Sequence, residues 1–215
     1  MNRTMTFFAT AVAIAAGSTA TAQNYPAKPI RIISEYSAGN GGDVFFRHLA
    51  RFFSAATEQQ WVIDNRSGAG GLLAVEAAMR VAPDGYTLLA ASQNVFVTRR
   101  YLSRTGHVDA LQDFTPVSAL WRTTLVIAAS ETLPGFEPPP TWTALFAPAR
   151  LPPAILASLH ASIVKGVNAP EARAKAASDG FELIGNTPEQ FAAQIKRDIE
   201  VAGRLVKVAK IEPLD

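Results

Sequence analysis

The feature that most constrains the fold of this chain is a short apolar run that passes through a glycine-rich loop into a helix-like segment. It spans residues 30–44, IRIISEYSAGNGGDV, and residues 62–71, VIDNRSGAGG, repeat the design. Glycines allow backbone N–H groups to point outward, and the first turn of a helix carries a partial positive charge. We therefore predict anion-binding loops at two helix starts, with Asp43 capping the first helix. Strand-to-helix turns also use glycine for structural reasons alone.

Strand-like and helix-like segments alternate through the first part of the chain. The strands are predicted at residues 30–34, 61–63 and 86–91, and the helices at 43–57 and 70–81. This βαβαβ order is typical of a parallel sheet with right-handed crossovers. Ligands of such sheets bind beyond the carboxyl ends of the strands, so both glycine loops and Ser92, Gln93 and Asn94 are expected at one edge.

The second part of the chain contains a proline-rich break. Strands predicted at residues 113–120 and 124–129 precede LPGFEPPP at 133–140, a segment that excludes a helix or a central strand. The chain then resumes with a strand at 141–146, helices at 152–167 and 170–179, and a strand at 181–184. A closing amphipathic helix is expected after the N-cap Thr187, with Pro188 at its first position.

Residues 1–22 have the pattern of a secretory signal peptide. Arg3 precedes an apolar run at residues 5–16, and Ala-Thr-Ala closes the segment at 20–22. The run is too short to span a bilayer, and its small-residue end suits cleavage before Gln23. We therefore expect an exported, periplasmic protein.

The sequence has no cysteine, so thiol catalysis and cysteine metal sites are excluded.

The charge balance does not indicate a polyanionic partner. Lys and Arg number 20 and Asp and Glu number 18, so the chain without Arg3 would carry 19 and 18, a balance of +1.

His48, His107 and His160 lie on different predicted elements without the spacing of metal ligands. The glycine loops miss the last glycine of the dinucleotide motif, and no nucleophile-elbow motif follows residue 22. We expect no nucleic-acid partner, metal, cofactor or catalytic residue.

Five segments together resemble one known family. They are YPAKPIRIISEYSAGNGGDVFFR, VIDNRSGAGG, AAMRVAPDGYTLL, DFTPVSAL and TPEQFAAQIKRDIE. In this order the chain resembles the Bug family of tripartite tricarboxylate transporter substrate-binding proteins, often called TctC-like receptors. The resemblance implies a fold like that of type II periplasmic binding proteins, in which two α/β lobes close on a small organic acid. It also implies that the membrane subunits of such a transporter are the partner, and we expect a monomer.

The resemblance also indicates a missing segment. In the family a second lobe follows the strand predicted at 124–129, and the chain returns near a segment similar to residues 133–148. The resemblance therefore implies that roughly a hundred residues are absent between Ser130 and Leu133, about the size of one small domain. We predict a Rossmann-like first lobe built from residues 23–130 and 141–215, a connector at 131–140, and a second lobe that is largely deleted.

The site residues implied by the resemblance come from three loops. The first loop would hold a ligand carboxylate through backbone amides and ordered water, and it comprises Tyr36, Ser37, Ala38, Gly39, Asn40, Gly41, Gly42 and Asp43. Two positions depart from the family, because Glu35 replaces a usual proline and could repel an anion, and Asn40 replaces a common glycine. Tyr36 could wall the pocket or serve only as a packing aromatic.

The other two loops leave more than one interpretation open. Arg66 could bind a ligand carboxylate or form a structural salt bridge, with Asp64 as a candidate partner. Ser92, Gln93 and Asn94 could donate to a ligand or could be ordinary polar loop residues.

Three functional hypotheses follow from the sequence. The first is a solute receptor for a small carboxylic acid, with binding impaired by the loss of the second lobe. The second is a folded remnant that binds nothing. The third, and least favoured, is an exported enzyme.

Overall fold

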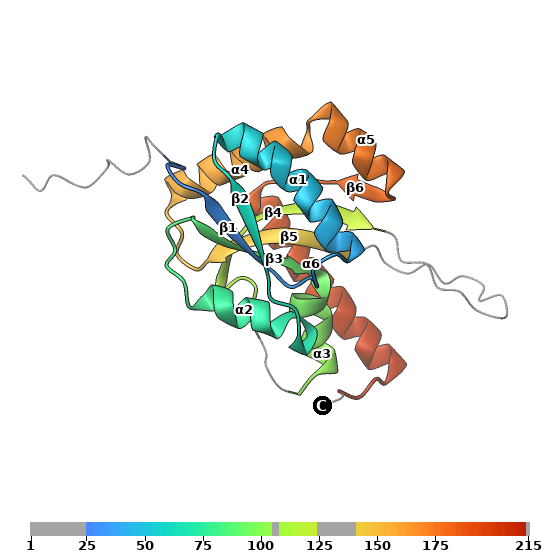
Figure 1. Ribbon diagram of the computed structural model, residues 1–215. Helices are drawn as coiled ribbons and strands as arrows, with labels where there is room; N and C mark the ends of the chain where they lie inside the picture. The colour runs from blue at the N-terminus through green and yellow to red at the C-terminus, as the bar shows by residue number, and fades with distance from the viewer. Residues whose placement is uncertain (1–24, 105–107, 124–140, 214–215) are drawn as a thin grey trace, which may run out of the picture.

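One mixed β-sheet organises the part of the chain that the structure describes, residues 25–104, 108–123 and 141–213 of a computed structural model (Figure 1). Its strand order is β2-β1-β3-β5-β4-β6. The strands are β1 (Ile30–Ser34), β2 (Trp61–Asn65), β3 (Thr87–Ser92), β4 (Phe114–Thr123), β5 (Thr141–Pro148) and β6 (Phe181–Leu183). The predicted signal peptide, the strand at 124–129, the connector at 131–140 and His107 lie outside the described residues.

The sheet is parallel in its first half and antiparallel in its second. β1 pairs in parallel with both β2 and β3, as the βαβαβ order predicts. β5 pairs antiparallel with β3 and with β4, and β6 pairs antiparallel with β4. Alternation of strands and helices predicts parallel pairing only where a helix makes the crossover. The position of β5 between β3 and β4, antiparallel to both, has no local sequence signal.

Helices cover both faces of the sheet (Figure 1). One face carries α1 (Gly41–Thr57), α4 (Pro153–Val167) and α5 (Pro170–Ser178). The other face carries η1 (Ala69–Gly71), α2 (Leu72–Met79), the π-helical turn η2 (Asn94–Thr98), α3 (Arg99–Leu102) and α6 (Pro188–Ala209). This arrangement of one sheet between two helical layers confirms the predicted α/β fold class.

The alternation of side chains along the strands divides the core into two layers. Ile30 and Ile32 face α1 and α4, whereas Ile33 faces α2 and η2, and all three are fully buried. Both layers are rich in aromatic residues, with Phe53 against Trp61 on one side and Phe146 against Phe191 on the other. The two apolar layers fix the position of the strand ends that carry the glycine loops.

The helix boundaries differ from the prediction mainly at one place. Residues 94–102 form η2 and α3, for which the sequence analysis predicted no element. Val95, Phe96 and Val97 are consecutive and buried, so they show no helical periodicity. α6 begins as predicted, with Thr187 as its N-cap and a reciprocal hydrogen-bonded pair between Thr187 and Gln190.

A glycine in α4 allows close packing against α1 and supplies a first prediction. A Cβ at Gly166 would lie 2.5 Å from Cδ1 of Phe53. We expect Gly166→Ala to lower the free energy of unfolding by about 1–3 kcal/mol, because overpacking outweighs the helix-propensity gain of about 1 kcal/mol. The measurement is urea unfolding followed by circular dichroism. Gly41→Ala, where nothing lies within 4 Å of the added Cβ, is the matched control, and equal stability of the two variants would contradict the packing role.

Candidate functional site

The first glycine loop joins the carboxyl end of β1 to α1. α1 begins at Gly41, and its N-cap is Asn40, whose side-chain oxygen accepts a hydrogen bond from the Asp43 amide at 2.8 Å. The prediction that Asp43 caps the helix is therefore wrong. Asn40 has the extended backbone of an N-cap residue, whereas Asp43 already lies within the first helical turn.

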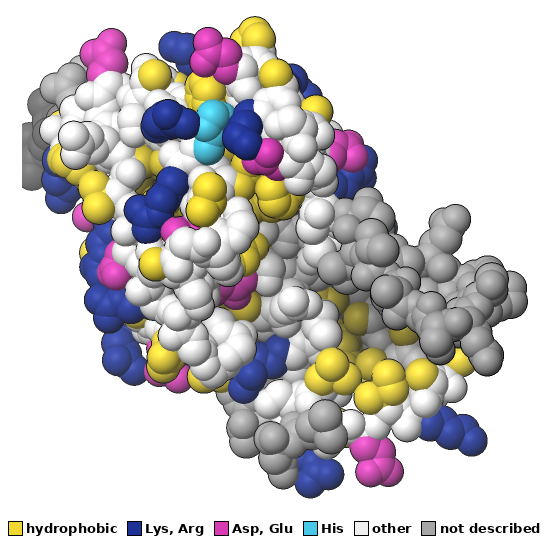
Figure 2. Space-filling model, turned by 45° about the vertical axis from the view of Figure 1, so that its right-hand side comes forward, with side chains coloured by type: hydrophobic (Ala, Val, Ile, Leu, Met, Phe, Trp, Pro, Cys, Tyr) yellow, Lys and Arg dark blue, Asp and Glu magenta, His cyan; other side chains and the backbone are white. Residues whose placement is uncertain are grey.

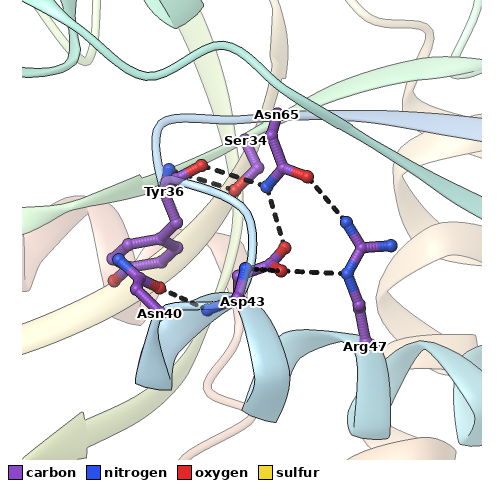
Figure 3. A network of polar contacts seen from close by, with 7 residues as sticks. Ser34, Tyr36, Asn40, Asp43, Arg47 and Asn65 are labelled. Atoms are coloured by element: carbon purple, nitrogen blue, oxygen red, sulfur yellow. Dashed lines mark hydrogen bonds and ion pairs between the residues drawn. The ribbon is translucent and has the colours of Figure 1, made fainter.

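Asp43 instead forms the buried centre of a polar network, and the residues that donate to its carboxylate are partly or fully exposed (Figure 3). Its Oδ2 accepts hydrogen bonds from the Gly39 amide at 2.8 Å and from Arg47 Nε at 3.0 Å, and its Oδ1 accepts one from Asn65 Nδ2 at 2.8 Å. The residue is only 1% exposed. Burial alone would raise the pKa of Asp43, but the hydrogen bonds from Arg47, Gly39 and Asn65 hold it below its usual value.

This network joins the first loop to the second. Asn65 lies at the end of β2 and also donates to the Tyr36 carbonyl at 3.0 Å, while Arg47 donates to Asn65 Oδ1 at 2.6 Å. Asp43 thus supplies an internal negative charge at the start of α1, and it takes up the Gly39 amide that the sequence analysis assigned to a ligand.

Other amides of the first loop remain available. Ser37, Ala38 and Gly41 are exposed and Gly42 is partly exposed. Within the described part of the chain, the amides of these four residues donate to no other group. They lie beside the positive end of the 17-residue helix α1. The arrangement can accept a carboxylate on its outer side.

Tyr36 packs beneath the loop. A Cβ at Gly42 would lie 2.9 Å from the Tyr36 ring, so glycine is what lets the ring approach the helix. The Tyr36 hydroxyl is hydrogen-bonded to Thr143 of β5, and its ring stacks on Trp121 with centroids 6.5 Å apart. Burial raises the pKa of Tyr36 to about 12. Tyr36 therefore packs as the sequence allowed, its role as a wall of a ligand pocket stays a prediction, and its contact with Thr143 was not predicted.

Glu35 is turned into the protein rather than away from it. Its Oε1 accepts a hydrogen bond from the Ser92 amide at 2.7 Å, and its Oε2 lies 2.5 Å from where a Cβ at Gly71 would stand. Among the described residues Glu35 has no ion-pair partner. Burial raises the pKa of Glu35, although hydrogen bonds from Ser92 act in the opposite direction. An unpaired carboxyl group therefore lies between the ends of β1 and β3 and the second glycine loop.

Arg66 of the second loop already has an ion-pair partner. Arg66 Nε lies 3.2 Å from Asp64 Oδ2, and Asp64 also pairs with Arg31 of β1. The hydrogen bonds from Arg31, outweighing the effect of burial, hold the pKa of Asp64 below its usual value. The salt-bridge interpretation of Arg66 is confirmed, and a role in ligand binding stays a prediction.

Ser92, the last residue of β3, and the two residues after it do not share one environment. The Ser92 amide is bound to Glu35, and Asn94 is exposed in η2. Gln93 lines a separate cavity between η2, α3 and α6. The structure thus brings Ser92 to the glycine loops and places Gln93 in other surroundings.

Two further properties concern the described residues only. No cluster of three or more His, Cys, Asp or Glu side chains in this part of the chain could hold a metal ion. No described helix combines the length and the apolar character that a membrane crossing would need.

Sequence comparisons identify similar proteins. Residues 45–137 match the model of the family described as tripartite tricarboxylate transporter family receptor. A UPF0065 protein of Bordetella bronchiseptica is 37% identical over 109 residues, which are 51% of this chain and 32% of that protein. Protein BugT of Bordetella pertussis is 35% identical over 114 residues, 53% of this chain and 35% of that protein. The chain thus spans about a third of the length of these curated relatives.

Solved structures share the fold. An R. palustris protein solved with adipate aligns with a TM-score of 0.77 and 18% identity, over 88% of this chain and 100% of that chain. MatC of Rhodopseudomonas palustris, solved with bound malate, aligns with a TM-score of 0.73 and 18% identity, over 85% and 100%. The resemblance to TctC-like receptors and the periplasmic binding protein-like fold class are therefore confirmed. The matching family is one of transport receptors and not of enzymes.

Proposed function

We propose that this chain, which is similar to the tripartite tricarboxylate transporter receptors of the TctC and Bug type, is an exported solute receptor that retains one lobe and binds a small carboxylic acid weakly. The observation that carries the proposal is the exposed loop at the start of α1, where the amides of Ser37, Ala38, Gly41 and Gly42 are free of described partners. Such donors at a helix start favour an anion.

The ligand class follows from this loop and from the relatives. A carboxylate is planar and accepts several hydrogen bonds, so it fits adjacent backbone amides. Two solved proteins with this fold carry adipate and malate in their descriptions. For this chain we propose a small mono- or dicarboxylate delivered to the membrane subunits of a tripartite tricarboxylate-type transporter in the periplasm, after removal of residues 1–22.

The affinity should be low for two reasons. In the proposed organisation the second lobe is largely deleted between residues 130 and 133, so the closure that excludes water from the ligand is lost. Each missing charge-assisted hydrogen bond removes about 1.5–3 kcal/mol, so two of them weaken binding by a factor on the order of a hundred to ten thousand. Glu35 adds a carboxyl group close to the same strand end.

A second candidate is a folded remnant that binds no solute. The observation in its favour is that the protein's own carboxyl groups already take two backbone donors at this edge, Asp43 the Gly39 amide and Glu35 the Ser92 amide. An exported enzyme is the least favoured reading, and turnover of an ester or phosphate panel that disappears on changing one loop residue would support it.

Calorimetric titration with malate, adipate, glutamate, citrate and nicotinate tests the proposal. We expect at least one acid to bind with a Kd of about 1 mM or higher, which corresponds to a binding free energy no more favourable than about −4 kcal/mol. Gly41→Asp places a competing carboxylate at the first residue of α1 and should abolish binding. Ala55→Asp, exposed near the other end of α1, is the charge-matched control and should bind as the unmodified protein does. If none of the acids gives heat or a thermal shift, the receptor proposal is wrong and the folded remnant that binds no solute takes its place.

A further inference from the structure

A cavity of about 340 Å³, the α6 cavity, lies on the face of the sheet opposite α1, between η2, α3 and α6. Its lining is mostly apolar, with Val97, Leu102 and Val206 among the residues that form it. Leu205 and Ile211 also line it and are exposed, so the cavity is open to solvent beside the last turns of α6. Figure 2 shows hydrophobic side chains gathered low on the molecule, in the region where Figure 1 places α6. The size is within the range of small-molecule sites.

Among the described residues that line the cavity, Asp198 of α6 is the only acid. It is partly exposed, and its Oδ2 accepts a hydrogen bond from Trp142 Nε1 at 2.8 Å. In the described part of the chain no Lys, Arg or His side chain forms an ion pair with it. A carboxylate accepts up to about four hydrogen bonds, so Asp198 can take a further donor.

The surroundings of Asp198 favour a cation beside it. Burial raises the pKa of Asp198, although the hydrogen bond from Trp142 and the charge of Arg197 act in the opposite direction. The carboxylate has therefore lost part of the stabilisation that water would give it. A positively charged group that enters the cavity would restore that stabilisation.

The basic residues near the cavity do not fill this role. Arg122, the basic residue in the described lining, forms two hydrogen bonds with Glu182, with its Nε 2.7 Å from Oε2. Arg197 follows the cavity residues along α6 but is exposed, so water and salt screen its charge. Asp198 is thus the acid of the lining that has no paired base.

The walls of the cavity are fixed before any ligand binds. The Tyr101 hydroxyl of α3 donates to the Ile199 carbonyl of α6 at 2.8 Å. A Cβ at Gly203 would lie 2.7 Å from that hydroxyl oxygen, so glycine permits the close approach of the two helices. Together with the bond from Trp142 to Asp198, this contact holds α6 in place. A preformed site loses little free energy to ordering on binding.

We propose that the α6 cavity is a second binding site, separate from the glycine loops, for a small primary amine with an aromatic or alkyl body, such as benzylamine. The body contacts the apolar side chains of η2, α3 and α6, and the ammonium group donates to the Asp198 carboxylate. A ligand carboxylate would meet a like charge there, so this site selects the opposite charge to the loop at the start of α1. It does not depend on the proposed carboxylate function.

Titration calorimetry of the whole protein with benzylamine and benzyl alcohol at neutral pH tests the site. Benzylamine should bind at least about tenfold more tightly than benzyl alcohol, which has the same body without the charge. Asp198→Asn keeps an oxygen that can accept the bond from Trp142, and it should remove the advantage of the amine while leaving benzyl alcohol unchanged. Glu200→Gln, exposed on the same helix, is the matched control and should bind both as the unmodified protein does.

Equal affinity for benzylamine and benzyl alcohol, no binding of either, or an unchanged preference in Asp198→Asn would overturn the proposal. A second pair of variants separates the cavity from general surface binding. Leu205 lines the cavity and is 55% exposed, and Leu73 on α2 is 50% exposed at another place. Leu205→Arg should abolish benzylamine binding, whereas Leu73→Arg should leave it unchanged. The same loss in both variants, or none in Leu205→Arg, would also overturn the proposal, and circular dichroism of each variant shows that the fold is kept.

Discussion

Replacing Asp43 with alanine should lower the free energy of unfolding by about 1.5–3 kcal/mol, the range for lost hydrogen bonds to a charged group, because Asp43 is buried but its partner Arg47 is exposed. The change leaves the Gly39 amide, the Asn65 amide and the Arg47 guanidinium without the carboxylate that joins them. It also removes the bond from Asn65 to Asp43, while the bond from Asn65 to the Tyr36 carbonyl still joins the two loops. Urea unfolding followed by circular dichroism measures the loss.

The pH dependence of this loss follows from the direction of the pKa shift. The folded protein holds the pKa of Asp43 below its usual value, so the stabilisation is present above the unfolded pKa of about 3.9 and disappears as the pH falls through the folded value. The difference between the unmodified protein and Asp43→Ala should therefore narrow below about pH 4. Glu76→Ala, which removes one exposed pair with Arg80 on α2, is the control and should change stability by less than about 0.5 kcal/mol. An equal effect of the two changes would contradict the role of Asp43.

Replacing Glu35 with glutamine should strengthen carboxylate binding by about tenfold to thirtyfold. An ionised Glu35 repels a carboxylate bound at the loop that follows β1, and relief of about 1.4–2 kcal/mol of this repulsion corresponds to about tenfold to thirtyfold in affinity. Glutamine keeps an oxygen that can accept the bond from the Ser92 amide. Titration of the unmodified protein and of the variant with malate at neutral pH measures the change.

Glu35→Gln should also change the dependence of stability on pH, with the opposite sign to Asp43. Because burial raises the pKa of Glu35, the folded state holds a proton that the unfolded chain releases above about pH 4.3, and stability falls as the pH rises towards the folded value. The variant should be more stable than the unmodified protein at pH 7 and equal to it below about pH 4. Glu200→Gln, exposed on α6, is the control. A variant that is no more stable at pH 7 and binds malate no better would contradict the account of Glu35.

Local sequence patterns predict the elements whose structure is set by their own residues. Residues 30–34 form β1 as the apolar run predicts, and Thr187 caps α6 as its place before Pro188 predicts. Local patterns do not decide which residue caps α1, because Asn40 and Asp43 are both good capping residues and lie less than one helical turn apart. Only the backbone geometry of the loop decides that Asn40 is the cap and that Asp43 is the buried acceptor.

Local sequence patterns do not predict contacts between segments that are far apart in the chain. Thr143 lies 107 residues from Tyr36, and the two meet only because β5 enters the sheet beside β3. The sequence singles out Glu35 as a departure from its relatives, but its direction depends on the Ser92 amide at the end of another strand. Gln93 was expected at the glycine loops, yet the π-helical turn that follows it carries its side chain to the α6 cavity.

The most direct test of the central claim, that the loop at the start of α1 is a surviving carboxylate site, is an NMR titration of the ¹⁵N-labelled protein with malate. The account predicts saturable shifts of the Ser37, Ala38, Gly41 and Gly42 amide signals, with a Kd of about 1 mM or weaker. The Gly39 amide, which donates to Asp43, should shift less. No saturable shift at these four amides, or shifts confined to other parts of the chain, would contradict the claim.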